Sequence, residues 1–231
     1  MVALLCSLLL FRQAAPPPFE KEILQFEAQD AKAPPKKGGI VFVGSSSIVR
    51  WKTLAQDFPG KNVLNRGFGG SEIADSVRYT DRIVTPYKPT VVVLFAGTND
   101  IANGKNALTV FSDYKEFVEK AHGKLPRTPV VYISITPSPS RWDLREAMRQ
   151  TNELIAGYVL KNHGSLVDAS GAVVKGEKLS RHPDLVLVDV YTQFISGDQP
   201  RPELFVEDKL HGNASAYAIW TRALGPVLAK L

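Results

Sequence analysis

The chain has 231 residues, of which 44% are hydrophobic and 22% charged, a composition typical of one globular domain and not of a disordered or fibrous chain. Its formal charge of +5 comes from 28 basic and 23 acidic residues that form no basic run, which disfavours a nucleic-acid partner. One cysteine and four scattered histidines give no disulfide framework and no CxxC or HExxH spacing, so we expect neither a metal site nor another cofactor.

The first eighteen residues differ in character from the rest. Residues 2–11 are apolar, and Ala14, Ala15 and three prolines follow, which resembles the hydrophobic region and small-residue end of an export signal. The run is too short to span a bilayer. No Lys or Arg precedes the run, and a proline directly after Ala15 is a poor cleavage context. We therefore expect residues 1–18 to be a signal or a membrane-proximal anchor and the protein to be exported to the periplasm or secreted; a helix packed on the domain and a cytoplasmic location are the alternatives.

The remaining chain, residues 19–231, predicts a single domain in which strands and helices alternate. Short apolar runs predict strands at residues 40–43, 63–65, 91–96, 130–135 and 185–190. Amphipathic segments predict helices at residues 47–56, 71–84, 107–124, 142–160 and 214–229. This alternation indicates a five-stranded parallel sheet with helices on both faces, a three-layer αβα sandwich of flavodoxin-like type.

One stretch departs from the alternation. Residues 161–184 are polar and contain three glycines, and they predict an inserted loop or a small hairpin before the last strand. Loops of that length are often functional lids or irregular surface.

Residues suited to chemistry follow the ends of successive predicted strands. A serine run at 44–47 follows the first strand, a glycine-rich stretch at 66–70 the second, and residues 97–100 the third. In an open parallel sheet ligands bind beyond the carboxyl ends of the strands, so these three stretches meet at one edge. Residues 208–211, in the loop before the last helix, can reach the same edge.

The residue types at that edge suit nucleophilic catalysis. A serine hydroxyl becomes a good nucleophile only when a base takes its proton, and the base works best when a carboxylate fixes its tautomer. Asp208 precedes His211 by three residues, which places both on one side of a helical turn and leaves the other ring nitrogen free to face Ser46. The serine run lacks the GxSxG spacing of the α/β-hydrolase elbow.

These blocks, in this order, resemble the SGNH hydrolases, also called GDSL-like esterases and lipases. The resemblance covers nearly all of the chain after Pro34 and is carried by residues 43–48, 65–67, 97–100 and 208–211. It implies Ser46 as nucleophile, His211 as general base and Asp208 as its orienting acid. Where the family has Gly-Asp-Ser this chain has Gly-Ser-Ser, so Ser45 and Ser47 are the alternative nucleophiles.

The resemblance also implies an oxyanion hole and a substrate class. Its donors are the backbone N–H groups of Ser46 and Gly67 and the side-chain amide of Asn99. Arg141 and Trp142 follow the fourth predicted strand and are candidate substrate-binding residues; Trp142 could equally cover core surface.

The chain is most similar to the small esterases related to platelet-activating-factor acetylhydrolase. That similarity implies hydrolysis of small ester substrates with short acyl groups, such as acetyl groups on sugars or lipids. The alternative is a catalytically silent module on the same fold that binds a glycan or a lipid.

Overall fold

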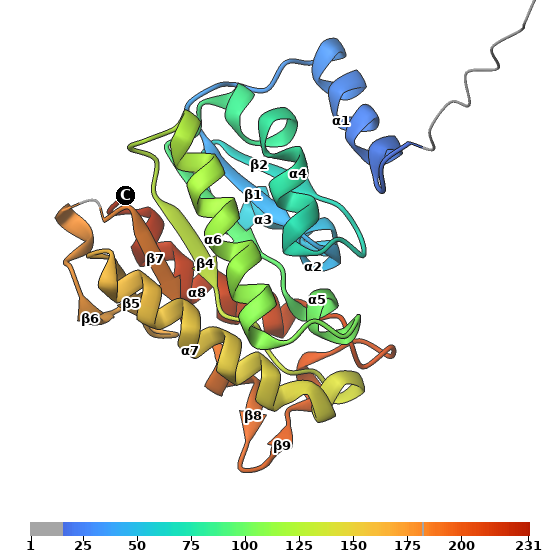
Figure 1. The fold of residues 1–231 in the computed structure, drawn as a ribbon, viewed down its shortest axis with the longest axis vertical. Coiled ribbons are helices and arrows are strands. Elements are labelled where there is room, and N and C mark those ends of the chain that lie inside the picture. Colours follow the sequence, from blue (N-terminus) through green and yellow to red (C-terminus); the bar gives the residue numbers. More distant parts are fainter. Residues whose placement is uncertain (1–15, 182) are drawn as a thin grey trace, which may run out of the picture.

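A mostly parallel sheet of seven strands runs through the molecule in the order β2-β1-β3-β4-β7-β5-β6 (Figure 1). In this computed structural model the described residues are 16–181 and 183–231. The strands are β1 (Ile40–Gly44), β2 (Val63–Gly67), β3 (Val91–Phe95), β4 (Val130–Ile133), β5 (Ser165–Val167), β6 (Val173–Gly176) and β7 (Leu185–Val188). A separate hairpin pairs β8 (Ile195–Ser196) with β9 (Gln199–Pro200).

Helices cover both faces of this sheet (Figure 1). One layer holds α1 (Glu20–Lys32), α4 (Ile73–Ile83), α6 (Ala107–Lys124) and α7 (Arg145–Lys161). The other holds α2 (Ser46–Arg50), α3 (Leu54–Asp57) and α8 (Ala214–Leu228), while the short α5 (Thr98–Ala102) follows β3. Five 3₁₀ segments complete the described elements: η1 (Thr85–Tyr87), η2 (Pro139–Leu144), η3 (Leu179–Arg181), η4 (Tyr191–Phe194) and η5 (Pro202–Leu204).

The two cores on either side of the sheet explain why the strands are apolar throughout. In β1, Val41 and Val43 pack under α1, α4 and α6, while Ile40 and Phe42 pack under α2, α3 and α8. Side chains alternate along a strand, so a strand covered on both faces has no polar positions. The predicted three-layer α/β sandwich is confirmed.

The predicted count of five strands is wrong, because residues 161–184 contribute two more. β5 pairs parallel with β7, from Ser165 against Val186 to Val167 against Val188, and β6 pairs antiparallel at the sheet edge. The segment is thus a hairpin whose first strand extends the main sheet and not an irregular loop. β5 has only three residues, and its partner is distant in sequence, so periodicity does not reveal it.

The predicted helix at 47–56 is also wrong in detail, since it divides into α2 and α3. Trp51 leaves the helical conformation with ψ of 74°. Its ring then packs against Phe42 and Tyr217 at centroid distances of 5.6 Å and 5.3 Å. Burial of this ring favours the break over a continuous helix.

Helix α1 was not among the predicted elements. It is fastened by ion pairs: Asp30 binds the buried Arg66, and Glu20 and Glu27 both bind Arg82 of α4, at 2.8 Å and 2.7 Å. The predicted signal or anchor falls mainly on residues 1–15, outside the described part, and stays a prediction. Among the described residues no helix has both the length and the apolar character needed to cross a membrane.

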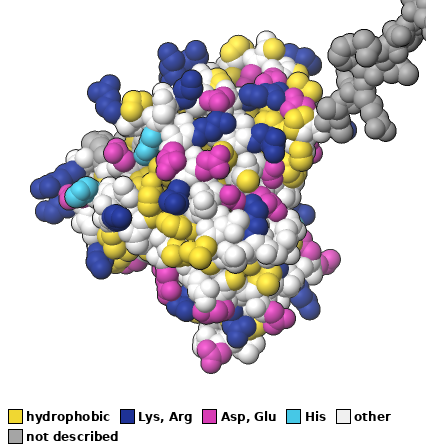
Figure 2. All heavy atoms as spheres, in the orientation of Figure 1, with side chains coloured by type: hydrophobic (Ala, Val, Ile, Leu, Met, Phe, Trp, Pro, Cys, Tyr) yellow, Lys and Arg dark blue, Asp and Glu magenta, His cyan; other side chains and the backbone are white. Residues whose placement is uncertain are grey.

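Basic and acidic side chains are mixed on the surface, as their scatter along the sequence predicts. On the face seen in Figure 2, Lys and Arg side chains are interspersed with Asp and Glu, and short apolar stretches lie between them. This face carries no continuous basic stripe of the kind that tracks a nucleic-acid backbone.

Candidate active site

The serine run lies in a tight turn between β1 and α2. Gly44 has φ of +141°, and a β-carbon there would come within 2.0 Å of the carbonyl oxygen of Phe95. Only glycine fits such a conformation and such a close approach. Ser45 donates its backbone N–H to the same carbonyl, at 3.1 Å, so the turn is anchored on β3. Ser46 is therefore delivered as the first residue of α2.

The acid and the histidine lie in a second tight turn that precedes α8. Residues Phe205 and Gly212 form an antiparallel bridge, and the Val206 N–H donates to the His211 carbonyl at 2.9 Å. Lys209 takes a left-handed conformation with φ of 55°, which reverses the chain. The Asp208 Oδ1 atom accepts the backbone N–H groups of Leu210 and His211, both at 2.9 Å. Asp208 thus shapes the turn that presents the imidazole.

The two turns meet in a linked series of three side chains. The Ser46 Oγ atom lies 2.9 Å from His211 Nε2, and His211 Nδ1 lies 2.6 Å from Asp208 Oδ2. The backbone N–H and then the imidazole of His211 hold the pKa of Asp208 well below its usual range. Asp208 is therefore a permanent anion near neutral pH and holds the proton on Nδ1, which leaves Nε2 as an acceptor for the serine proton.

The geometry distinguishes the three adjacent serines. Among the described residues, Ser46 is the serine whose hydroxyl contacts an imidazole. Ser45 is 1% exposed, at the turn anchored on β3. Ser47 accepts the Tyr217 hydroxyl on its backbone carbonyl, at 2.8 Å, which ties α8 to the serine turn. Because Tyr217 lies 170 residues further along the chain, no sequence signal pointed to it.

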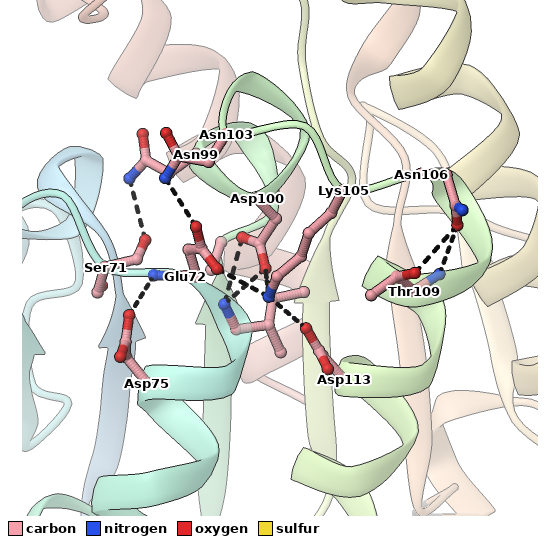
Figure 3. A network of polar contacts seen from close by, with 12 residues as sticks. Ser71, Glu72, Asp75, Asn99, Asp100, Asn103, Lys105, Asn106, Thr109 and Asp113 are labelled. Carbon is pink, nitrogen blue, oxygen red and sulfur yellow. Dashed lines mark hydrogen bonds and ion pairs between the residues drawn. The ribbon is translucent and has the colours of Figure 1, made fainter.

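Asn99 is the second residue of α5, beside this arrangement, and its amide is fixed at both ends. Its Nδ2 donates to the Ser71 carbonyl at 3.0 Å, a bond drawn in Figure 3, and its Oδ1 accepts from Arg141 Nη1 at 3.0 Å. An amide nitrogen carries two hydrogens, so one hydrogen of Nδ2 remains to be donated. Asn99 is thus a positioned neutral donor, and its role in an oxyanion hole stays a prediction.

A partly buried ionic network holds the turn that carries Asn99 (Figure 3). Asp100 is fully buried and accepts the Ile73 N–H at 3.1 Å, which joins α5 to the start of α4. Lys105 binds Asp100, Asp113 and Glu72, at 3.1 Å, 2.6 Å and 2.7 Å. Burial raises the pKa of Asp100; burial alone would lower the pKa of Lys105, but its carboxylate partners outweigh that effect and raise it.

Gly67 does not join the site as expected. It is buried at the end of β2, its N–H donates to Asn65 Oδ1 at 2.9 Å, and it does not line the cavity beside Ser46. A β-carbon there would come within 2.6 Å of the Val49 nitrogen, so this glycine is required for packing against α2. Asn65, which also donates to the Ile48 carbonyl at 2.6 Å, takes up the N–H that a substrate oxygen would need.

The turn that follows Gly67 carries two more glycines. Gly69 and Gly70 are exposed, and Gly70 has φ of +83°. They immediately precede Ser71, whose carbonyl fixes Asn99, but neither lines the cavity beside Ser46.

A small, partly open cavity adjoins the linked side chains. The space inside it that is open to the centre of a water molecule is about 30 Å³. Its lining includes the linked serine and histidine, the Asn99 amide and aromatic rings: Ser46, His211, Asn99, Arg141, Thr136, Ser138, Phe95, Phe194, Tyr217 and Trp220.

The two candidate substrate-binding residues lie in different places. Arg141 lines the cavity, whereas Trp142 does not and instead stacks under the guanidinium of Arg145, at 4.8 Å from the ring centroid.

Comparisons with known proteins agree with this fold and with the resemblance noted from the sequence. A profile of the GDSL-like lipase/acylhydrolase family matches residues 43–219. No curated protein gave a match.

Several solved structures superpose over most of the chain. A protein from Bacteroides fragilis described as an acylhydrolase is 22% identical, with a TM-score of 0.71 over 90% of this chain and 96% of the other. One from Streptococcus pneumonia, described as a platelet activating factor, is 17% identical, with a TM-score of 0.68 over 90% and 92%. An acetyl-xylooligosaccharide esterase from Geobacillus is 13% identical, with a TM-score of 0.56 over 84% and 95%. At these identities the structures show the shared fold.

Proposed function

We propose a function on the premise that the chain belongs to the GDSL-like lipase/acylhydrolase family and is a hydrolase of esters. Within that class, it is a serine esterase that forms an acyl-enzyme on Ser46, with His211 as general base and Asp208 as the orienting acid. The observation that carries this proposal is the unbroken series from the Ser46 hydroxyl through the His211 ring to the Asp208 carboxylate, at 2.9 Å and 2.6 Å.

The reaction follows from the proton positions. As the Ser46 oxygen attacks the ester carbonyl carbon, its proton passes to His211 Nε2, and the imidazolium is stabilised by the Asp208 anion. The tetrahedral intermediate collapses, the carbon–oxygen bond to the alcohol breaks, and His211 returns the proton to that oxygen. A water molecule then repeats the sequence on the acyl-enzyme and releases the carboxylic acid.

The developing oxyanion needs donors that are already in place. The backbone N–H of Ser46 is the first of α2 and has no intrahelical acceptor, and Asn99 retains one amide hydrogen. Each preorganised donor of this kind typically contributes about 10²- to 10³-fold to the rate. Because the N–H of Gly67 is bonded to Asn65 Oδ1, the proposal rests on the Ser46 N–H and the Asn99 amide as donors.

A short acyl group suits the cavity. About 30 Å³ of accessible space accommodates roughly one water-sized group, which matches the methyl of an acetyl ester better than a long chain. The likeness in fold to an acetyl-xylooligosaccharide esterase adds acetylated sugars to the substrates worth testing.

The test compares alanine variants of the three serines. Ser46→Ala is expected to lower kcat for p-nitrophenyl acetate by about 10³- to 10⁶-fold, because the nucleophile is lost while the donors remain. Ser45→Ala and Ser47→Ala serve as matched controls from the same turn and should retain activity within about tenfold. Full activity in Ser46→Ala, with loss in either neighbour, would move the nucleophile and refute this assignment.

A further inference from the structure

We propose that Arg141 makes this site selective for esters whose alcohol part carries an anionic group, a carboxylate or a phosphate. This inference rests on the proposed esterase function and specifies its substrate class. Arg141 lines the same cavity as Ser46 and His211.

The charge of Arg141 is not compensated by the protein. Four arginines of the described chain are buried or mostly covered, and three of them bind carboxylates: Arg66 binds Asp30, Arg82 binds Glu20 and Glu27, and Arg201 binds Glu203. Among the described residues, Arg141 has no carboxylate within 4.0 Å, and the residues that line the cavity include no Asp or Glu. Burial lowers the pKa of Arg141, as expected for a cation removed from water without a counter-ion.

The guanidinium also has donors to spare. Its hydrogen bond within the described chain goes from Nη1 to Asn99 Oδ1, at 3.0 Å. A guanidinium carries five N–H donors in a planar fork that suits carboxylate and phosphate oxygens. Four donors are therefore left for water or for a ligand.

The segment that presents Arg141 is fixed to the catalytic turn. The Ser140 N–H donates to the Lys209 carbonyl at 3.0 Å, and the Arg141 N–H donates to the Ser138 carbonyl at 3.0 Å. Lys209 lies between Asp208 and His211 in sequence. The cation is therefore placed relative to the reacting serine without having to be ordered by the ligand, which lowers the entropic cost of binding.

The geometry assigns the anion to the alcohol part of the ester. The accessible space of about 30 Å³ is used up by a small acyl group. Asn99 Nδ2 and Oδ1 belong to one planar amide, and Arg141 binds Oδ1. An ester carbonyl oxygen bound at Nδ2 therefore lies close to an anionic group bound at Arg141. An alcohol that carries an acidic group a few bonds from its ester oxygen can span the distance from the ester to Arg141.

The experiment compares a charged ester with a neutral ester of matched shape. For the wild-type chain, kcat/KM for 3-acetoxybenzoate should exceed that for 3-acetoxybenzamide by about 10- to 100-fold, the factor expected of a hydrogen bond to a charged group. Most of the difference should lie in KM, and it should shrink at high salt. A third compound, 3-acetoxyphenyl phosphate, shows which anion is preferred.

Variants then assign the preference to one side chain. Arg141→Gln removes the charge and loosens the hold on Asn99 Oδ1, so it should lower kcat for both esters by a similar factor and also abolish the preference for the charged ester. Arg141→Lys should retain part of that preference. The control is Arg145→Gln, because Arg145 is exposed, stacks on Trp142 and should leave the ratio unchanged.

The outcomes separate the two proposals. Hydrolysis of both esters at similar rates, or an unchanged ratio in Arg141→Gln, overturns the role of Arg141 and leaves the esterase proposal intact. A folded wild-type chain that hydrolyses none of these esters or p-nitrophenyl acetate overturns both.

Discussion

Replacement of Asp208 by asparagine tests how the histidine is oriented. The Asp208 carboxylate accepts three hydrogen bonds, from the Leu210 and His211 backbones and from the His211 ring. An asparagine can keep the two backbone bonds through its carbonyl oxygen, so the turn should survive. Its nitrogen, however, would donate toward Nδ1 and favour the tautomer with the proton on Nε2, which cannot accept the Ser46 proton.

The magnitude follows from exposure. Where such an aspartate is buried, its replacement by asparagine costs about 10⁴-fold in kcat. The Asp208 side chain is 40% exposed, so water can take over part of its role, and we expect a loss of about 10²- to 10⁴-fold. The loss should lie in kcat with little change in melting temperature.

Steady-state kinetics with p-nitrophenyl acetate, together with thermal unfolding followed by circular dichroism, measure both quantities. Asp57→Asn is a matched control, because Asp57 also binds a ring N–H, that of Trp51, but lies in α3 and not at the cavity. Retention of more than about a third of wild-type kcat in Asp208→Asn would refute the orienting role. A loss of activity that merely parallels unfolding would refute it too.

Two further predictions concern pH and the serine turn. Because the pKa of Asp208 is lowered, this group stays ionised as pH falls through the mildly acidic range, so its protonation does not end activity. A base that already carries a proton cannot accept another, so kcat/KM should fall as the pH is lowered. A pH–rate profile that stays flat on acidification while the protein remains folded would exclude His211 as the base. Gly44→Ala should lower the free energy of unfolding by about 3 kcal/mol or more, since it combines positive φ with an overlap against Phe95 that the packed sheet cannot relieve. Urea unfolding measures this, and an unchanged midpoint would show that the turn relaxes freely.

The sequence predicted the covered strands well, because burial on both faces leaves a legible signal. The runs at β1, β3, β4 and β7 are fully buried, and each was identified within two residues at either end. β5 was not predicted because it has only three residues, and β6 was not predicted because none of its side chains is buried. Helix α1 was not predicted because its attachment depends on ion pairs to residues distant in sequence. Arg82, for example, lies 55 positions from Glu27.

The site was predictable to the extent that chain topology alone positions it. Ser46 and Asn99 follow strands that end at one edge of the sheet, and Asp208 and His211 are close in sequence, so their meeting needed no knowledge of packing. The assignment of Gly67 as an oxyanion donor was wrong because its N–H is bonded to the Asn65 side chain, two residues away. The direction of that side chain cannot be predicted from the sequence.

The roles proposed for the residues at this edge depend on one covalent event, the proposed acylation of Ser46. Incubation of the folded protein with a fluorophosphonate, followed by tryptic digestion and fragmentation of the peptide covering residues 38–50, locates the adduct among three adjacent serines. We predict a single phosphonyl group on Ser46, and no adduct after His211→Ala. Modification of Ser45 or Ser47, or a folded wild-type protein that stays unlabelled, would contradict it.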